Sequence, residues 1–165
     1  MRAYRTFRDR LEDREGSTLV EFALSVSIVI ALLFWIFYAS MALYADHFTE
    51  NAARAATRYA MVRGSTWGGA TCSSPSSLEC TATDTDVSNY VKALVSPGLD
   101  SSALSVTTTW PGTTPSGATC ETSEGNNSPY CSVMVQVTYN FDLTVPFLPH
   151  QQIGLSSAAS APITE

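Results

Sequence analysis

Four cysteines are the residues of this sequence whose chemistry is easiest to name. Cys72, Cys80, Cys120 and Cys131 all lie on the C-terminal side of one long apolar stretch, among glycines, serines and threonines. An even number of cysteines in such a region is typical of disulfides formed in an oxidising compartment. Three pairings are possible. We favour Cys72–Cys80 with Cys120–Cys131, because each of these bridges closes a short loop.

The histidines and serines are poorly arranged for a metal site or for catalysis. No Cys-x-x-Cys pair occurs, and neither His47 nor His150 is near a cysteine in sequence, so zinc is the weaker alternative. The segment GSTWG at residues 64–68 has serine in its second place and does not fit the G-x-S-x-G nucleophile motif. No phosphate-binding loop or dinucleotide fingerprint occurs. We therefore expect no metal, no cofactor and no enzymatic activity.

A carboxylate at the head of an apolar run is the second notable feature. Glu21 is the fifth residue after Gly16, and an uncharged segment begins directly after it. A charge deep in a bilayer costs roughly 2.5–3.5 kcal/mol or more. A glutamate at the interface, near a helix start, is instead favoured by the helix dipole. Glu21 alone is therefore ambiguous, and its surroundings must decide its role.

Those surroundings predict a membrane anchor. The chain is uncharged from Phe22 to Ala45, a run of about 24 residues, which is enough for a helix to span a bilayer core of about 30 Å. Five arginines precede this run, which places the N-terminus in the cytoplasm and the rest outside it. A cleavable secretory signal ending near residues 39–42, ASMA, is the main alternative, but its apolar region is usually only about 7–15 residues long.

The helical pattern continues beyond the apolar run. Residues 46–63 are rich in alanine and arginine and contain neither glycine nor proline, and Gly64 then offers a stop. We therefore expect one helix over residues 17–63. An apolar stripe recurs at helical spacing along its outer half, made by Phe48, Ala52, Ala55, Ala56, Tyr59 and Val62. We expect this stripe to pack against the rest of the chain rather than against partner helices.

The remaining residues, 64–165, predict a small extracytoplasmic domain. A short helix is expected where Val87, Tyr90, Val91 and Leu94 share one face. Period-two alternation predicts strands over residues 104–110 and, most clearly, 132–145, with a weaker one over 153–161. The expected fold is α+β, with a long transmembrane helix that extends out of the membrane and packs against a small antiparallel sheet.

The charge distribution argues against nucleic-acid binding. The whole chain carries a net charge of −6, and only 15% of its residues are charged. The acidic residues are concentrated beyond the apolar run. A protein that binds a phosphate backbone needs the opposite sign.

The N-terminal third resembles a known family. A small residue at Gly16, a glutamate at the fifth position after it and an apolar helix resemble the type IV prepilin processing site. The segments EGSTLVEFAL and NAARAATRYAMVRG are similar to those of the TadE-like minor pilins, or pseudopilins, of tight-adherence (Tad/Flp) pilus systems. Ser17 stands where many mature pilins have a bulky apolar residue, and Phe22 where Tad pilins typically have tyrosine.

The resemblance implies a division of the chain and a set of partners. Residues 1–16 would be a cytoplasmic leader, and a membrane prepilin peptidase would cut it off between Gly16 and Ser17. Glu21 and Phe22 would take part in assembly, with the Glu21 carboxylate neutralising the new α-amine of a neighbouring subunit. Other pilins, the pilus assembly platform and inner-membrane lipid would be the partners. An anchored binding domain that does not assemble, or an anchored enzyme with an unrecognised site, stays open.

Overall fold

A computed structural model of the chain describes residues 2–64, 82–115, 117–120, 130–144 and 150–164, and the side chains within these ranges from Gly16 onwards. The order of elements is α1 (Arg2–Met61), α2 (Asp84–Ala93), the 3-10 turn η1 (Ser101–Ala103), β1 (Leu104–Thr109), β2 (Ser132–Leu143) and β3 (Gln151–Pro162). This is the expected α+β fold. Cys72 and Cys80 lie outside the described residues.

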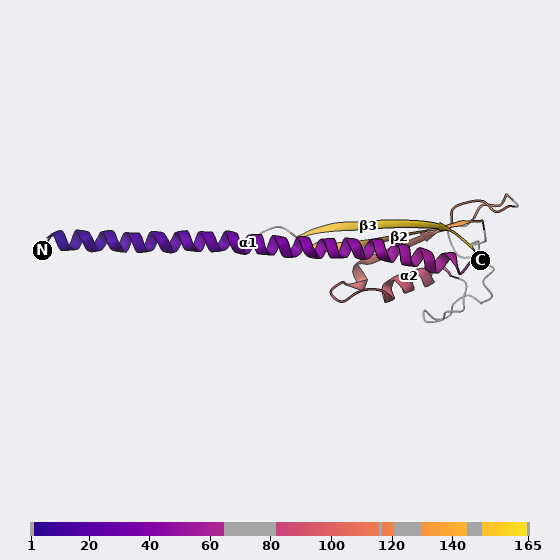
Figure 1. The fold of residues 1–165 in the computed structure, drawn as a ribbon, viewed down its shortest axis with the longest axis horizontal. Coiled ribbons are helices and arrows are strands. Elements are labelled where there is room, and N and C mark those ends of the chain that lie inside the picture. The colour runs from indigo at the N-terminus through magenta and orange to yellow at the C-terminus, as the bar shows by residue number, and fades with distance from the viewer. Residues whose placement is uncertain (1, 65–81, 116, 121–129, 145–149, 165) are drawn as a thin grey trace.

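Helix α1 dominates the shape of the molecule. It contains 60 residues, which corresponds to a rod of about 90 Å, and its N-terminal half projects away from the rest of the chain (Figure 1). The sequence predicted a start near Ser17, but the helix begins at Arg2 and passes Gly16 without a break. A single glycine costs only about 1 kcal/mol relative to alanine in a helix, and no proline occurs before it, so nothing in this segment stops the helix.

The three strands form one antiparallel sheet in the order β1-β2-β3. Strand β2 is the centre and pairs with β3 over its whole length, from Ser132 opposite Pro162 to Leu143 opposite Gln151. The period-two pattern of β2 is confirmed, because Val133, Val135 and Val137 are fully buried while the residues between them are more exposed. One face of the sheet is therefore covered and the other faces solvent.

The covered face packs against the C-terminal part of α1. Small residues form the contact surface of the helix, and its buried positions are Ala45, Thr49, Ala52, Ala53, Ala56, Thr57 and Ala60. The larger residues that the sequence favoured for this stripe, Phe48 and Tyr59, are only partly buried beside it. The Thr57 hydroxyl donates to the carbonyl oxygen of Ala159 on β3 at 3.2 Å, so helix and strand approach closely. Intramolecular packing of the outer half of α1 is confirmed.

Helix α2 covers the rest of the same face. It begins with a capping box, in which the Thr83 side chain accepts from Asp86 N and the Asp86 carboxylate accepts from Thr83 N. Tyr90 on α2 stacks on Tyr59 of α1 with ring centroids 4.4 Å apart, and the Arg63 guanidinium lies 4.2 Å from the Tyr59 ring centre. Burial raises the pKa of the Tyr59 hydroxyl, an effect that the nearby Arg63 charge opposes.

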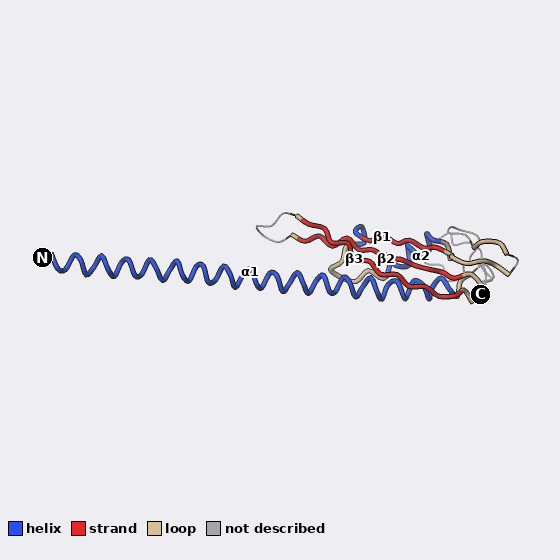
Figure 2. The backbone as a smooth tube through the Cα atoms, turned by 90° about the horizontal axis from the view of Figure 1, so that it is seen from above, coloured by secondary structure: helices blue, strands red, loops and turns tan. Residues whose placement is uncertain are grey.

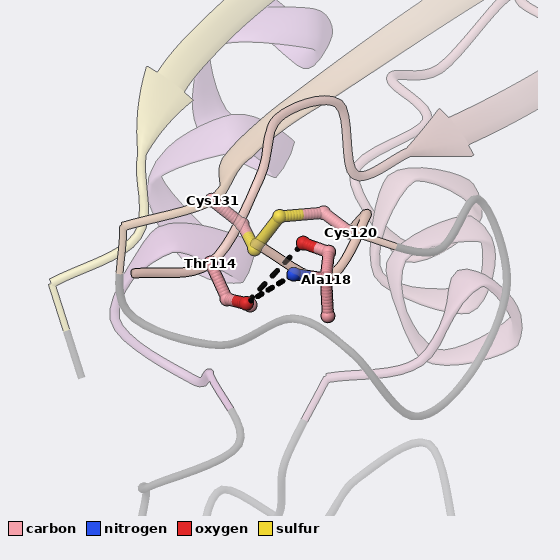
Figure 3. The surroundings of a disulfide bond; sticks show 4 residues. All are labelled: Thr114, Ala118, Cys120 and Cys131. Carbon is pink, nitrogen blue, oxygen red and sulfur yellow. Dashed lines mark hydrogen bonds between the residues drawn. A yellow bond between two sulfur atoms is a disulfide. The ribbon is translucent and has the colours of Figure 1, made fainter. Parts of the chain in front are cut away.

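A disulfide closes the far end of the domain. Cys120 and Cys131 are bonded, as the loop lengths predicted, and Cys131 stands directly before β2. The segment before Cys120 folds back on itself, with Thr114 bonded to Ala118 through its backbone and its hydroxyl (Figure 3). The Cys120 amide donates to Gly112 O at 2.9 Å. The bridge therefore ties this turn to the start of the central strand.

The end of α1 is held by the end of the chain. The helix stops at Met61, slightly before the expected Arg63. The Thr164 amide donates to the Met61 carbonyl oxygen at 3.0 Å, and the Ile163 amide donates to Cys131 O at 2.9 Å. Terminal helix carbonyls need such partners, because no further turn supplies them.

The contact between the small residues of α1 and the sheet predicts that a larger side chain there destabilises the domain. Ala56 is fully buried against the sheet, so Ala56→Leu forces extra atoms into a closed contact and should destabilise the folded domain by about 1–3 kcal/mol. Denaturant unfolding of the detergent-solubilised chain, followed by near-ultraviolet circular dichroism, measures this. Arg58→Leu is the matched control, because Arg58 is exposed on the same helix. Equal stability of the two variants would contradict the packing described.

A second prediction concerns the contribution of the Cys120–Cys131 disulfide to stability. A bridge with a sequence separation of 11 should contribute roughly 2–3 kcal/mol by restricting the unfolded chain. Replacing both Cys120 and Cys131 by serine should lower the free energy of unfolding by that amount. Peptide mapping without reduction should find this pair linked and should also find Cys72 linked to Cys80. A peptide that joins Cys72 or Cys80 to Cys120 or Cys131 would disprove the pairing.

Candidate functional site: the exposed face of the long helix

The N-terminal part of α1 has the length and hydropathy of a membrane span. The segment Gly16–Met61 contains an 18-residue window of mean hydropathy 2.5, and none of that window is buried inside the protein. The exposed apolar side chains are Leu19, Val20, Phe22, Leu24, Ile28, Val29, Ile30, Leu32, Leu33, Phe34, Trp35, Ile36 and Phe37. A core helix of a soluble protein would be covered, so this surface needs lipid or other helices as its surroundings.

The residues singled out for processing and assembly lie on one side of this span. Gly16, Ser17, Glu21 and Ser25 line the same shallow groove along the helix surface. Ser17, Glu21 and Ser25 follow each other at intervals of four residues, which places them one above the other on a helix. We call these three residues the polar stripe. A Cβ atom added at Gly16 would meet nothing within 4 Å, so the start of the stripe is open.

Two serine side chains of the span, Ser25 and Ser27, are bonded to their own helix. The Ser25 hydroxyl donates to the Glu21 carbonyl oxygen at 2.8 Å, and the Ser27 hydroxyl donates to the Ala23 carbonyl oxygen at the same distance. Such bonds to the preceding turn let a hydroxyl enter an apolar environment at low cost. The Glu21 carboxylate differs, because none of the described side chains gives it a hydrogen bond or an ion pair. Glu21 is therefore a charged group of the stripe that has no partner among the described side chains.

A second stripe lies on the other side of the helix. Ala23, Ser27 and Ala31 also recur at intervals of four residues, and Ala23 is about 200° around the helix from Glu21 at 3.6 residues per turn. Small residues at this spacing let a neighbouring helix approach closely. Phe22 lies beside the polar stripe, with 69% of its surface exposed, and offers an apolar contact there. The span thus has two different faces available for neighbours.

A groove near the base of the domain is a further concave feature of the described residues. It encloses about 340 Å³ between α1 and the end of α2, and it is lined by Tyr44, His47, Phe48, Asn51, Ala52, Ala55, Leu94 and Ser96. His47 is exposed, and the described residues contain no group of three or more His, Cys, Asp or Glu side chains that could hold a metal ion. The groove therefore offers apolar surface and one imidazole, without a catalytic arrangement.

The structure brings some of the sequence-predicted residues together and adds one contact that the sequence did not reveal. Gly16, Ser17 and Glu21 share a face, and Cys120 meets Cys131. The added contact is a hydrogen bond from the Tyr38 hydroxyl to the Thr144 carbonyl oxygen, across 106 positions in sequence. No local pattern could have signalled it, because its two residues belong to separate elements.

A comparison with known proteins finds a match for the N-terminal segment of the chain. No curated protein and no solved structure matches the chain. A family model described as TadE-like protein matches residues 16–58. This match begins at the glycine at the head of the polar stripe and continues through most of the alanine face that packs on the sheet. Over residues 16–58, the long helix of this chain is therefore similar to the corresponding segment of TadE-like proteins.

Proposed function

We propose that this chain is a minor pilin or pseudopilin that takes part in the assembly or initiation of a Tad (Flp) adhesion pilus. TadE-like proteins are associated with Tad pilus systems. The observation that carries the finer proposal is the polar stripe, which presents on an exposed helix face a carboxylate that has no partner among the described side chains. A helix that serves only as a membrane anchor has no need of a carboxylate on this face. A helix that packs against the helices of other subunits does need one.

The proposed assembly uses both faces of the span. Cleavage between Gly16 and Ser17 creates a charged α-amine at the head of the polar stripe. The Glu21 carboxylate of a neighbouring subunit, entering at a different height, neutralises this amine, because two unpaired charges in an apolar bundle would each be costly. Ala23, Ser27 and Ala31 on the other side accept the next helix. Other pilins and the assembly platform are thus the proposed partners.

Leader removal requires local opening of the helix. The bond after Gly16 lies inside α1, and a peptidase needs an extended backbone at the bond it cuts. Glycine is the residue at which opening costs least, because it gains the most conformational freedom on leaving a helix. Gly16 thus serves the prepilin peptidase without interrupting the helix of the intact chain.

Substitutions at Gly16 and Glu21 should separate processing from assembly. Gly16→Val should leave a full-length protein, because the branched side chain obstructs the peptidase. Glu21→Ala should be cleaved and stay anchored, since loss of a charge from an apolar helix favours the bilayer, but it should support few pili. Glu21→Gln should behave like Glu21→Ala, because it keeps the shape and removes the charge. N-terminal sequencing of envelope protein and pilus counts measure both effects.

Ser25→Ala is the matched control for these variants. Ser25 lies on the polar stripe, but its hydroxyl bonds to its own helix, so this change should leave both cleavage and pili intact. Wild-type protein that starts at Met1 would remove the processing step. Normal pili with Glu21→Ala would remove the role of the carboxylate and favour an anchored binding domain instead.

The proposal also fixes an orientation. Five arginines before the span should hold the N-terminus in the cytoplasm, so a reporter fused after Glu165 should be active outside the cytoplasm. Alkaline phosphatase, which needs disulfides, should gain activity in this fusion, and green fluorescent protein should stay dark when exported through the same route. The reverse result would invert the topology and remove the oxidising compartment from the account of the cysteines.

A further inference from the structure

The β2–β3 hairpin reaches back along the long helix towards the membrane span. The Tyr38 hydroxyl donates to the Thr144 carbonyl oxygen at 2.5 Å, and the Thr144 hydroxyl lies 3.2 Å from His150 Nε2 on the other side of the hairpin. Figures 1 and 2 show both strands running beside α1 with this end directed towards the N-terminus. We call Leu143, Thr144, His150 and Gln151 the hairpin end.

The rise per residue of α1 gives the depth of the hairpin end in the bilayer. Tyr38 lies about 26 Å beyond Glu21 along the helix axis, at 1.5 Å per residue. The hydrocarbon core of a bilayer is about 30 Å thick. With Glu21 at the inner boundary of the core, Tyr38 therefore lies just inside the outer boundary. Because Thr144 is bonded to Tyr38, the hairpin end lies at the same level.

Other positions of the bilayer core along α1 do not move the hairpin end out of contact with lipid. Moving the core towards the N-terminus would draw Glu21 and then the charged residues before Gly16 into hydrocarbon, which is costly. Moving it the other way, until it ends at Ala45, places Tyr38 about 10 Å inside the outer boundary. Tilting the helix lengthens the buried part and acts in the same direction.

The side chains of the hairpin end are compatible with a position at the outer boundary of the hydrocarbon core. Its four residues include no Asp, Glu, Lys or Arg, and Ile153, which follows on β3, has 42% of its surface exposed. The nearest carboxylate, Asp142, accepts a hydrogen bond from Gln152 Nε2 at 2.7 Å.

We propose that the hairpin end is a lipid-contacting surface that rests at the boundary between the headgroups and the acyl chains of the bilayer. The domain would then touch the membrane at two places, through α1 and through the hairpin end. Apolar and uncharged polar groups make this contact, so it requires no anionic lipid. It concerns the anchored chain and does not depend on pilus assembly.

Fluorescent labels at two positions of one strand test the depth directly. Gln151→Cys places a label at the hairpin end, and Ser160→Cys places one on the same strand about 30 Å away at 3.3 Å per residue. Both residues are exposed, so neither label removes a buried contact. The full chain, with its disulfides formed, is reconstituted in phosphatidylcholine vesicles that contain a lipid with a nitroxide near the headgroup.

The environment-sensitive label at position 151 should show blue-shifted emission and several-fold stronger quenching than the label at position 160. Equal quenching of the two labels would overturn the proposal. A label at position 151 whose blue shift disappears when the protein is diluted with excess lipid would also overturn it, because the hairpin end would then be contacting a second copy. A Thr144→Cys label repeats the measurement at a neighbouring position and should agree with position 151.

Discussion

The contact between the alanine face of α1 and the sheet is the interaction on which the rest of the domain depends. Helix and strands can approach closely because the helix surface is built from alanine and threonine, as the Thr57 hydrogen bond to the backbone of β3 illustrates. Close packing of this kind gains dispersion contacts and leaves no room for larger side chains. The position of the sheet on the helix is thereby fixed, and with it the level at which the domain stands relative to the span.

One helix thus serves in two different surroundings. Up to Phe37 it presents leucine, isoleucine and phenylalanine outwards, which are suited to lipid, and from Ala45 onwards it presents alanine and threonine inwards, which are suited to a sheet. The change of composition occurs without a change of secondary structure. The Glu21 carboxylate is the exception in the first part, and its lack of a described partner sets it apart from the serines that bond to their own backbone.

Much of this architecture could be predicted from the sequence, for reasons that differ between elements. Strand β2 was clear, because burial on one face imposes period two on its valines. The disulfide between Cys120 and Cys131 followed from loop length.

The start of α1 was misplaced, because one glycine was given more weight than the helix-forming residues before it. The buried stripe of α1 was shifted, since alanine carries a weaker hydrophobic signal than Phe48 or Tyr59. The Tyr38 to Thr144 contact could not be predicted, because tertiary packing alone creates it. The polar stripe was visible in the sequence as spacing, but only the structure shows that the Glu21 carboxylate has no partner among the described side chains.

The long sequence distance between α1 and β3 has a consequence for the order in which the domain folds. The alanine face of α1 is synthesised early, yet the strand that covers much of it and the Thr164 amide that caps Met61 are synthesised much later. Contacts that join such distant parts of a chain cannot form until both parts are present. The alanine face of α1 must therefore stay uncovered by β3 until that strand has been made.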